Sequence, residues 1–345
     1  MADTPNYAFV ELVPDLKPYI LAARQVRDAR NSLAVFLPNV AKQAVSYRLG
    51  RRKRLDQTVP IRAIDAPAIP IRRPGVIEVR GDLPAITPIV DFSELDLTQE
   101  MILAQQLAGL QVDYATWVAQ GGALCAATTE NTFELMRGQV LSTGTIVLET
   151  EDGATQDVDY EIPSDNKIHA NTPWDPTQPG AVFDGLTAAN EQFLDSSGDN
   201  GGAILTTSAV YNLMVAALQV RFPNQPIGQE SLSAYLASKK LPSRIITNDR
   251  KLENADGTKT RVYPEGYLTI LPSGDDPVGE TQLGVTQEAV QQVQNRVLTA
   301  QEAPGMTLVT LGSDNPVARA VKGASIGMPV LRDNEDIVIM SGLVA

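Results

Sequence analysis

The sequence predicts an α+β fold in which an extended arm and a two-stranded excursion are attached to a mixed core. Three observations predict it. Proline-broken segments with strand propensity fill residues 41–90, a strongly periodic helical stretch follows them, and the rest of the chain mixes short buried strands with helices. The chain has 345 residues, 43% hydrophobic and 20% charged, which suits either two compact lobes or one domain with large excursions, of ordinary globular composition.

The composition excludes several kinds of site. A single cysteine, Cys125, rules out an intrachain disulfide and a thiolate metal cage, and a single histidine, His169, rules out a histidine-rich metal centre. The N-terminal residues lack a signal-peptide pattern, and no stretch reaches about 18 consecutive apolar residues. We therefore expect a soluble protein of a reducing intracellular compartment, with no membrane partner.

Charge is distributed unevenly along the chain. The 28 basic and 41 acidic residues give a net charge of −13, which argues against a nucleic-acid binder that uses its whole surface. Residues 1–85 hold 14 basic and 8 acidic residues (+6), whereas residues 86–345 hold 14 and 33 (−19). Either the basic part of one copy lies on the acidic part of another, or the two parts are different solvated faces.

The first ninety residues are expected to be extended. In residues 1–40, four prolines leave room for only one short helix, over Tyr19–Ser32. In residues 41–90, prolines exclude central-sheet pairing, so we expect a two-stranded excursion with edge-type strands, which needs support from a neighbour. It carries the basic residues Arg51, Arg52, Lys53, Arg54, Arg72 and Arg73, which lack interleaved aromatic residues and are therefore candidates for contacts between subunits.

A helical pattern follows. Apolar residues recur at helical spacing from Asp96 to Trp117; Gly121-Gly122 interrupts the pattern, and a second helix is expected over Ala123–Leu141. A hairpin should then form, with strands at 145–150 and 157–162 and an Asp-Gly turn.

From residue 166 the pattern becomes mixed α/β, and residues 278–303 are ambiguous. The expected elements are helices at Asp184–Leu194, after Thr207 or Ser208, and at Ser231–Lys240; strands at Ala203–Thr206, Arg244–Thr247, Tyr267–Leu271 and Ile337–Val344; and a hairpin turn at Asp256-Gly257.

No residue pattern indicates catalysis, a cofactor or a metal. His169 lies near Ser164 and Asp165, but no nucleophile motif accompanies it, and a solvated loop histidine is the preferred interpretation. Cys125 lies in an apolar helical context and should be a small buried hydrophobe. The acidic runs Asp195–Asp199 and Asp333–Asp336 lack the spacing of a calcium loop, so we interpret them as solvated turns.

Four stretches carry a resemblance to a known family. They are Ser142–Leu148 with the strand Asp157–Tyr160, the Trp174-Asp175-Pro176 loop, the helix opening Thr206–Met214, and the C-terminal run Pro316–Asp333. In this order they resemble the phage major capsid protein E family, the lambda-type head proteins of the Hong Kong 97-type fold. The resemblance implies an N-terminal arm (1–40), an E-loop (41–90), a P-domain with a long spine helix and a hairpin (91–165), an A-domain (166–310) and a C-terminal return to the core (311–345).

The resemblance also implies a function. Copies of a non-enzymatic head protein would form hexamers and pentamers of an icosahedral shell around double-stranded DNA, with the arm and E-loop lying across neighbouring subunits. A separate scaffolding protein, a portal and a decoration protein are implied partners. The scaffolding protein is expected to be separate because the N-terminal segment is too short for a fused scaffold. The shell would assemble in the host cytoplasm without a covalent cross-link, although Lys42 and Lys53 lie in the part of the chain where such a cross-link would be expected. The alternatives are another phage or encapsulin-like structural protein and an α/β enzyme that uses His169.

Overall fold

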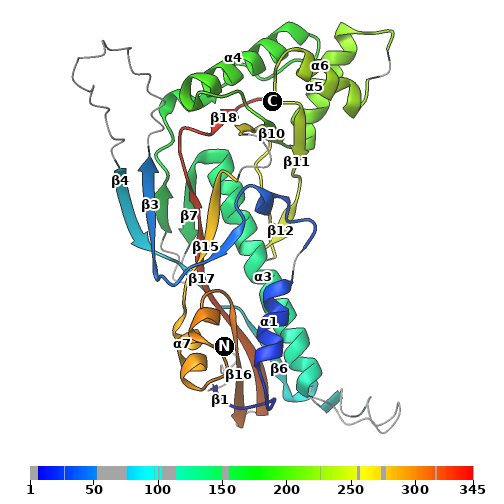
Figure 1. Ribbon diagram of the computed structural model, residues 1–345. Coiled ribbons are helices and arrows are strands. Elements are labelled where there is room, and N and C mark those ends of the chain that lie inside the picture. The colour runs from blue at the N-terminus through cyan, green and yellow to red at the C-terminus, as the bar shows by residue number, and fades with distance from the viewer. Residues whose placement is uncertain are drawn as a thin grey trace, which may run out of the picture.

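The computed structural model describes residues 7–26, 28–52, 76–96, 98–99, 102, 114–149, 155–225, 227–254, 257–272, 277–314 and 317–344. The molecule is elongated, with a sheet at each end and one long helix running between them (Figure 1). No helix within these ranges is long and apolar enough to cross a membrane.

The lower sheet is organised around one long strand, β17. Its antiparallel partners are β16, β15, β5 and β6, and the sheet continues from β16 to β1 and from β15 to the parallel strand β2. Residues more than 200 positions apart therefore lie side by side. The strands are β1 (Ala8–Phe9), β2 (Asn39–Ala41), β5 (Ala85–Ile86), β6 (Ile89–Ser93), β15 (Gly279–Leu283), β16 (Thr307–Asp314) and β17 (Val317–Leu331).

The upper sheet has the order β11-β10-β14-β18-β9, and α4, α5 and α6 surround it (Figure 1). Its inner strands, β10 and β14, are buried along their whole length, which explains their continuous apolar sequences. The elements are β9 (Lys167–His169), α4 (Pro179–Ser197), β10 (Ala203–Thr206), α5 (Ser208–Arg221), α6 (Gln229–Ser238), β11 (Arg244–Thr247), β14 (Leu268–Leu271) and β18 (Val338–Ser341).

Three hairpins and two further helices complete the described chain, with short 3₁₀ turns at Ser32–Val35, Ser164–Asn166 and Ala300–Glu302. The hairpins are β3 (Ser46–Arg52) with β4 (Val76–Asp82), β7 (Thr145–Glu149) with β8 (Thr155–Asp159), and β12 (Lys251–Glu253) with β13 (Lys259–Arg261); the helices are α1 (Lys17–Gln25) and α7 (Gln287–Gln294).

The expected break at Gly121-Gly122 is wrong, because α3 runs without interruption from Tyr114 to Thr143. The two glycines face the lower sheet. A Cβ on Gly121 would lie 3.0 Å from the Val321 side chain, and one on Gly122 would lie 2.7 Å from Leu308 Cδ1. The glycines therefore allow close packing of the helix on β16 and β17, and this packing offsets their low helix propensity, a cost of about 1 kcal/mol each. Of the first expected helix, from Asp96 to Trp117, residues 103–113 lie outside the described residues, and residues 114–117 form the start of α3.

Prolines also proved compatible with the lower sheet. Pro84 immediately precedes the short strand β5 and Pro88 lies two residues after it, and their carbonyl groups accept hydrogen bonds from Gly327 N (3.1 Å) and Gly323 N (2.8 Å). A proline lacks the donor but keeps its acceptor, so residues 84–93 join the edge of β17 instead of leaving the body of the molecule.

The remaining expectations agree with the structure, with shifted ends. The strands at 203–206 and 244–247 form as expected, and both predicted hairpins have paired strands, β7 with β8 and β12 with β13. The expected turn residues Asp152, Gly153 and Asp256 lie outside the described residues. The α4 helix starts at Pro179 instead of after Asp184, because proline is well suited to a first helical turn. The ambiguous region holds β15 and α7, and the Thr286 side chain caps α7 by accepting a hydrogen bond from Ala289 N.

Candidate assembly surfaces

The β3–β4 ribbon extends from the side of the body and is anchored at its base (Figure 1). Tyr47 and Leu83 are buried in the central core, and Leu83 N donates to Val45 O at 3.1 Å. Gly81, opposite Tyr47, is needed there, because a Cβ would lie 2.4 Å from the tyrosine hydroxyl. The base of the excursion is therefore part of the folded subunit.

The six basic candidates are only partly located. Arg51 and Arg52 lie in β3, opposite Ile77 and Val76, at the end of the ribbon away from its base, and their side chains are not among those described. Lys53, Arg54, Arg72 and Arg73 lie outside the described residues. The structure thus places two of the six on one strand and leaves their contacts as a prediction.

Within the described residues from Tyr7 onward, the N-terminal arm packs on its own subunit, and its expected contact with a neighbour stays a prediction. Strand β1 pairs with β16, and Ile20 of α1 is fully buried against α3 and the lower sheet. Tyr7 donates to Asp91 Oδ1 at 2.9 Å, and burial together with this carboxylate raises the pKa of Tyr7 to about 12. Lys17 Nζ lies 2.9 Å from Glu302 Oε1.

Residues 28–32 of the arm contact the upper part of the molecule. Arg250 Nη2 donates to Asp28 Oδ2 at 3.0 Å and to Asn131 Oδ1 at 2.8 Å, so one guanidinium joins the arm, the long helix and the β11–β12 connection. Asn248 Nδ2 donates to Ser32 Oγ at 3.1 Å. Hydrogen bonds from Arg30, together with the charge of Arg250, hold the pKa of the Asp28 carboxyl well below its usual range.

A buried ionic network lies between the arm, α3 and β15. Arg137 is completely buried and donates to Glu134 Oε2 (3.1 Å), Thr281 Oγ1 (3.0 Å) and Asn39 Oδ1 (2.5 Å). Glu134, also buried, accepts the Leu33 N–H at 2.9 Å. Burial raises the pKa of Glu134, while the Leu33 N–H and Arg137 oppose that shift. Sequence reasoning missed this network; the only signal was a Glu-x-x-Arg pair on the apolar face of a helix.

The residues considered for catalysis do not form a catalytic arrangement among the described residues. His169 is exposed in β9, and its Nδ1 lies 3.0 Å from Ser341 Oγ, whereas Ser164 and Asp165 hydrogen-bond to each other at 3.3 Å. Cys125 is fully buried as expected; its Sγ lies 3.5 Å from Val321 O, and burial raises the pKa of the thiol. No cluster of three metal-ligating side chains occurs within the described ranges.

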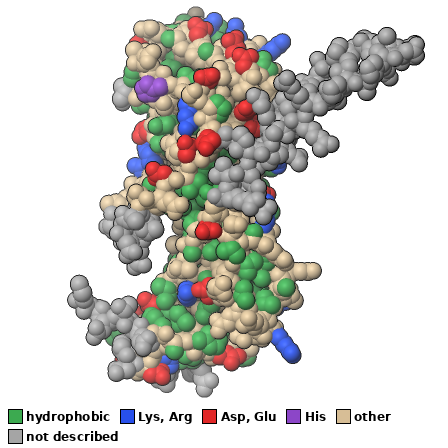
Figure 2. All heavy atoms as spheres, turned by 90° about the vertical axis from the view of Figure 1, so that its left-hand side faces the viewer, with side chains coloured by type: hydrophobic (Ala, Val, Ile, Leu, Met, Phe, Trp, Pro, Cys, Tyr) green, Lys and Arg blue, Asp and Glu red, His purple; other side chains and the backbone are tan. Residues whose placement is uncertain are grey.

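The surface beside the ribbon is chemically mixed. In Figure 2, carboxylates are spread over the upper part, and apolar side chains gather on the lower part, where β1, β16 and α7 lie. Exposed apolar residues of these elements include Phe9 and Val290. The molecule thus offers extended surfaces suited to contacts with other macromolecules.

Comparison with known proteins points in the same direction. The model of the family described as phage major capsid protein E matches residues 43–340. Two crystal structures share the fold over nearly the whole chain. A candidate prophage capsid protein from Escherichia coli CFT073 has a TM-score of 0.59 and 14% identity, covering 94% of this chain and 95% of its own. A phage-related protein from Bordetella bronchiseptica RB50 has a TM-score of 0.60 and 13% identity, covering 97% and 98%. No curated protein sequence matches the chain significantly.

Proposed function

The chain belongs to the phage major capsid protein E family, and from this premise we propose how it builds a shell. It is a structural subunit of a bacteriophage capsid with the Hong Kong 97-type fold, and it acts in the virion as one copy among many. We propose that the copies form hexamers and pentamers of an icosahedral head around double-stranded DNA. The observation that carries this proposal is the family match over residues 43–340, which includes the ribbon and most of the two-sheet body.

The parts of the subunit are proposed to divide the work. Residues 1–40 form the N-terminal arm, 41–90 the E-loop, 91–165 the P-domain, 166–310 the A-domain and 311–345 the return to the core. In this proposal the ribbon is the element that extends over a neighbouring subunit. Its projection from the body supports this, because an isolated two-stranded ribbon is at best marginally stable.

The protein is proposed to act through its interfaces and not as an enzyme. The described partner of the His169 ring is the Ser341 hydroxyl, and the Asp165 carboxylate is bonded to Ser164, so the acid that would orient the imidazole in a triad is bonded elsewhere. The family assignment also favours a phage capsid over an encapsulin-like shell or an α/β enzyme.

The basic residues of the ribbon are proposed to pair with acidic residues of adjacent subunits. Residues 1–85 carry a net charge of +6 and the remainder −19, so contact between these parts of two copies is electrostatically complementary. Exposed pairs contribute only about 0–1 kcal/mol each. Arg51, Arg52, Lys53, Arg54, Arg72 and Arg73 would therefore align neighbouring subunits more than they stabilise the shell.

Charge reversal tests this role. Arg51→Glu with Arg52→Glu should reduce the yield of closed particles seen by negative-stain electron microscopy and light scattering, while the subunit remains folded. The matched control is Lys239→Glu with Lys240→Glu, an adjacent exposed basic pair at the end of α6. Equal particle yields from the ribbon variant and the wild type would reject the proposed pairing.

The remaining partners are proposed from the family. A separate scaffolding protein, a portal and a decoration protein would act with the subunit during assembly in the host cytoplasm. The acidic chain would enclose DNA without sequence-specific binding, because like charge keeps the phosphates from adhering. Assembly would be non-covalent; Lys42, one of the two lysines considered for cross-linking, is paired with Glu280 of its own chain.

A further inference from the structure

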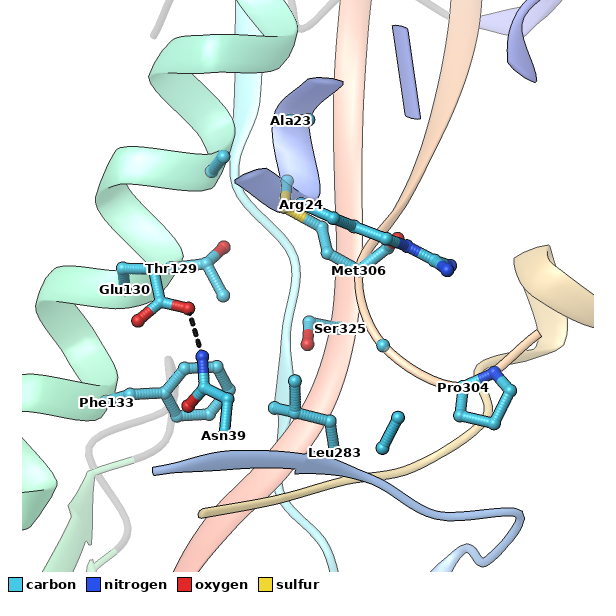
Figure 3. Close-up of a pocket in the computed structure, with 13 residues that line it drawn as sticks. Ala23, Arg24, Asn39, Thr129, Glu130, Phe133, Leu283, Pro304, Met306 and Ser325 are labelled. Carbon is cyan, nitrogen blue, oxygen red and sulfur yellow. Dashed lines mark hydrogen bonds between the residues drawn. The ribbon is translucent and has the colours of Figure 1, made fainter. Parts of the chain in front are cut away.

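A cavity of about 220 Å³ lies where α1, α3, β15 and β17 approach one another. Figure 3 shows side chains from all four elements converging on it. Its polar lining residues are Arg24, Asn39, Thr129, Glu130 and Ser325, and its apolar walls include Phe133 and Leu283. A largely apolar wall with a few convergent polar groups is the usual character of a small-molecule site.

Ser325 is the feature that indicates a ligand. The residue is only 1% exposed, and its hydroxyl has no hydrogen-bond partner among the described residues. Figure 3 places this hydroxyl in the middle of the cavity lining. Because burying a hydroxyl without a partner is destabilising, such a group requires an explanation, and a bound molecule provides one.

The charged groups at the cavity are already engaged. Glu130 accepts a hydrogen bond from the Asn39 amide at 2.5 Å and lies 3.8 Å from Arg137 Nη1. Arg24 donates through Nε to Met306 O at 2.6 Å and through Nη1 to Glu302 O at 2.7 Å. We therefore base the choice of ligand on the Ser325 hydroxyl, a neutral buried group without a described partner, which suits an uncharged ligand.

The volume of the cavity limits the size of the ligand. An apolar cavity of about 150 Å³ accepts a benzene molecule. A cavity of about 220 Å³ thus has room for a six-membered ring together with one polar substituent. The ring would pack on Phe133 and Leu283 while its polar group met Ser325.

We propose that this cavity is a binding site for a small uncharged molecule that combines one ring with one hydroxyl or carbonyl group. Because Ala23 and Arg24 of α1 line the site together with Glu130 of α3, the bound molecule holds the N-terminal arm on the body of its own subunit. A ligand that binds only this arrangement stabilises it in proportion to ln(1 + [L]/Kd). The inference does not depend on the proposed shell geometry.

The test uses phenol and benzene as probes on the unassembled full-length subunit. Phenol should bind saturably in calorimetric titration, and it should slow amide hydrogen exchange in Lys17–Gln25. Ser325→Ala should weaken phenol binding about 3- to 10-fold, the effect of one neutral hydrogen bond, and should leave benzene binding unchanged. Thr307→Val is the matched control, because the Thr307 hydroxyl is also buried without a described partner but does not line the cavity.

Filling the cavity provides an independent check. Ala126 is a buried residue of the cavity lining. The larger side chain in Ala126→Leu should fill the cavity and abolish binding of both probes. Absence of saturable phenol binding to the wild type would overturn the site, as would equal loss of phenol binding in Thr307→Val and Ser325→Ala. Binding without slower exchange in α1 would overturn its connection to the arm. If Ala126→Leu does not fold, the phenol and benzene comparison in Ser325→Ala decides the question.

Discussion

At the scale of single residues, the buried Arg137 is expected to have a large effect on the stability of the subunit. Its guanidinium lies between the carboxylates of Glu134 (3.1 Å) and Glu130 (3.8 Å) and also bonds to Asn39 and Thr281. Replacing both members of a buried ion pair by neutral groups of similar size often costs little, but removing one member leaves an uncompensated charge. The network therefore makes a prediction that depends on which partner is removed.

Arg137→Met should destabilise the subunit by about 3–5 kcal/mol in urea unfolding, because it leaves the Glu134 carboxylate buried without its cation. Adding Glu134→Gln should recover part of this loss. The pH dependence follows from the pKa of Glu134, which burial already raises. A carboxyl with a raised pKa in the folded state is tolerated when protonated and costs stability as the pH rises through that pKa. The deficit of Arg137→Met should thus be larger at pH 8 than at pH 5.

A surface arginine supplies the control for this experiment. Arg30 is 77% exposed and pairs with Asp28, so Arg30→Met should leave the urea midpoint nearly unchanged. If Arg137→Met and Arg30→Met had similar midpoints, or if the double variant were as unstable as Arg137→Met alone, the interpretation of Glu134 as a stranded charge would be wrong.

At the scale of elements, the packing of α3 reverses the usual effect of a glycine-to-alanine substitution. In an open helix position this change stabilises by about 0.5–1 kcal/mol. At Gly138, however, the new Cβ would lie 1.8 Å from the carbonyl oxygen of Val262, which is backbone and cannot move aside easily. We expect Gly138→Ala to lower the free energy of unfolding by about 1–3 kcal/mol, measured by thermal unfolding.

Gly185 in α4 is the matched position. A Cβ there would lie 3.6 Å from Trp174 Nε1, which is ordinary contact. Gly185→Ala should therefore be neutral or slightly stabilising. Equal effects at the two glycines would mean that helix propensity, and not the approach of α3 to Val262, determines the outcome.

The contact between α1 and the 3₁₀ turn Ala300–Glu302 should stabilise the folded subunit at neutral pH and lose this effect in acid. The Lys17 ammonium and hydrogen bonds from Thr299 lower the pKa of Glu302 from 4.5 to about 2. A lowered pKa means that this carboxylate stabilises the folded state above pH 4.5 and loses its effect as the pH falls towards 2. Glu302→Gln should accordingly lower the melting temperature at pH 6, and its difference from the wild type should shrink between pH 4.5 and 2. A difference that stayed constant over this range would contradict the pairing.

Some secondary-structure elements could be predicted from the sequence and others could not. The hairpin at 145–162 and the strand at Ala203–Thr206 were predictable because turn residues and β-branched runs are local signals. The continuity of α3 was not, since Gly121 and Gly122 are unfavourable locally and are compensated only by contact with Val321 and Leu308.

The site was predictable only in part, for the same reason. The charge pattern identified the basic ribbon as a candidate surface. The Arg137 network and the cavity at Ser325 depend on the parallel pairing of β2 with β15, which places Asn39 beside Thr281 although the two are far apart in the sequence. No local pattern carries information about such a contact.

At the scale of the whole molecule, two electrostatic effects act on assembly with opposite signs. Each subunit carries a net charge of −13, so free subunits repel one another over long distances. The proposed pairs between the basic ribbon and acidic neighbours attract only at contact. Salt separates the two effects, because the screening length is about 30 Å at 0.01 M, about 10 Å at 0.1 M and about 3 Å at 1 M.

The rate of shell assembly should therefore pass through a maximum as sodium chloride is raised from about 0.01 M to about 1 M. The first increase in salt removes the repulsion between whole subunits, and the later increase weakens the ribbon pairs. Initial rates from light scattering of the purified subunit, with scaffolding protein where assembly requires it, measure both limbs. Arg51→Glu with Arg52→Glu should flatten the falling limb, because reversing two of the six basic charges weakens the attraction that salt screens, whereas Lys239→Glu with Lys240→Glu should leave this limb as steep as in the wild type. A wild-type rate that only rises with salt would show that net repulsion dominates and that the ribbon pairs contribute nothing to association.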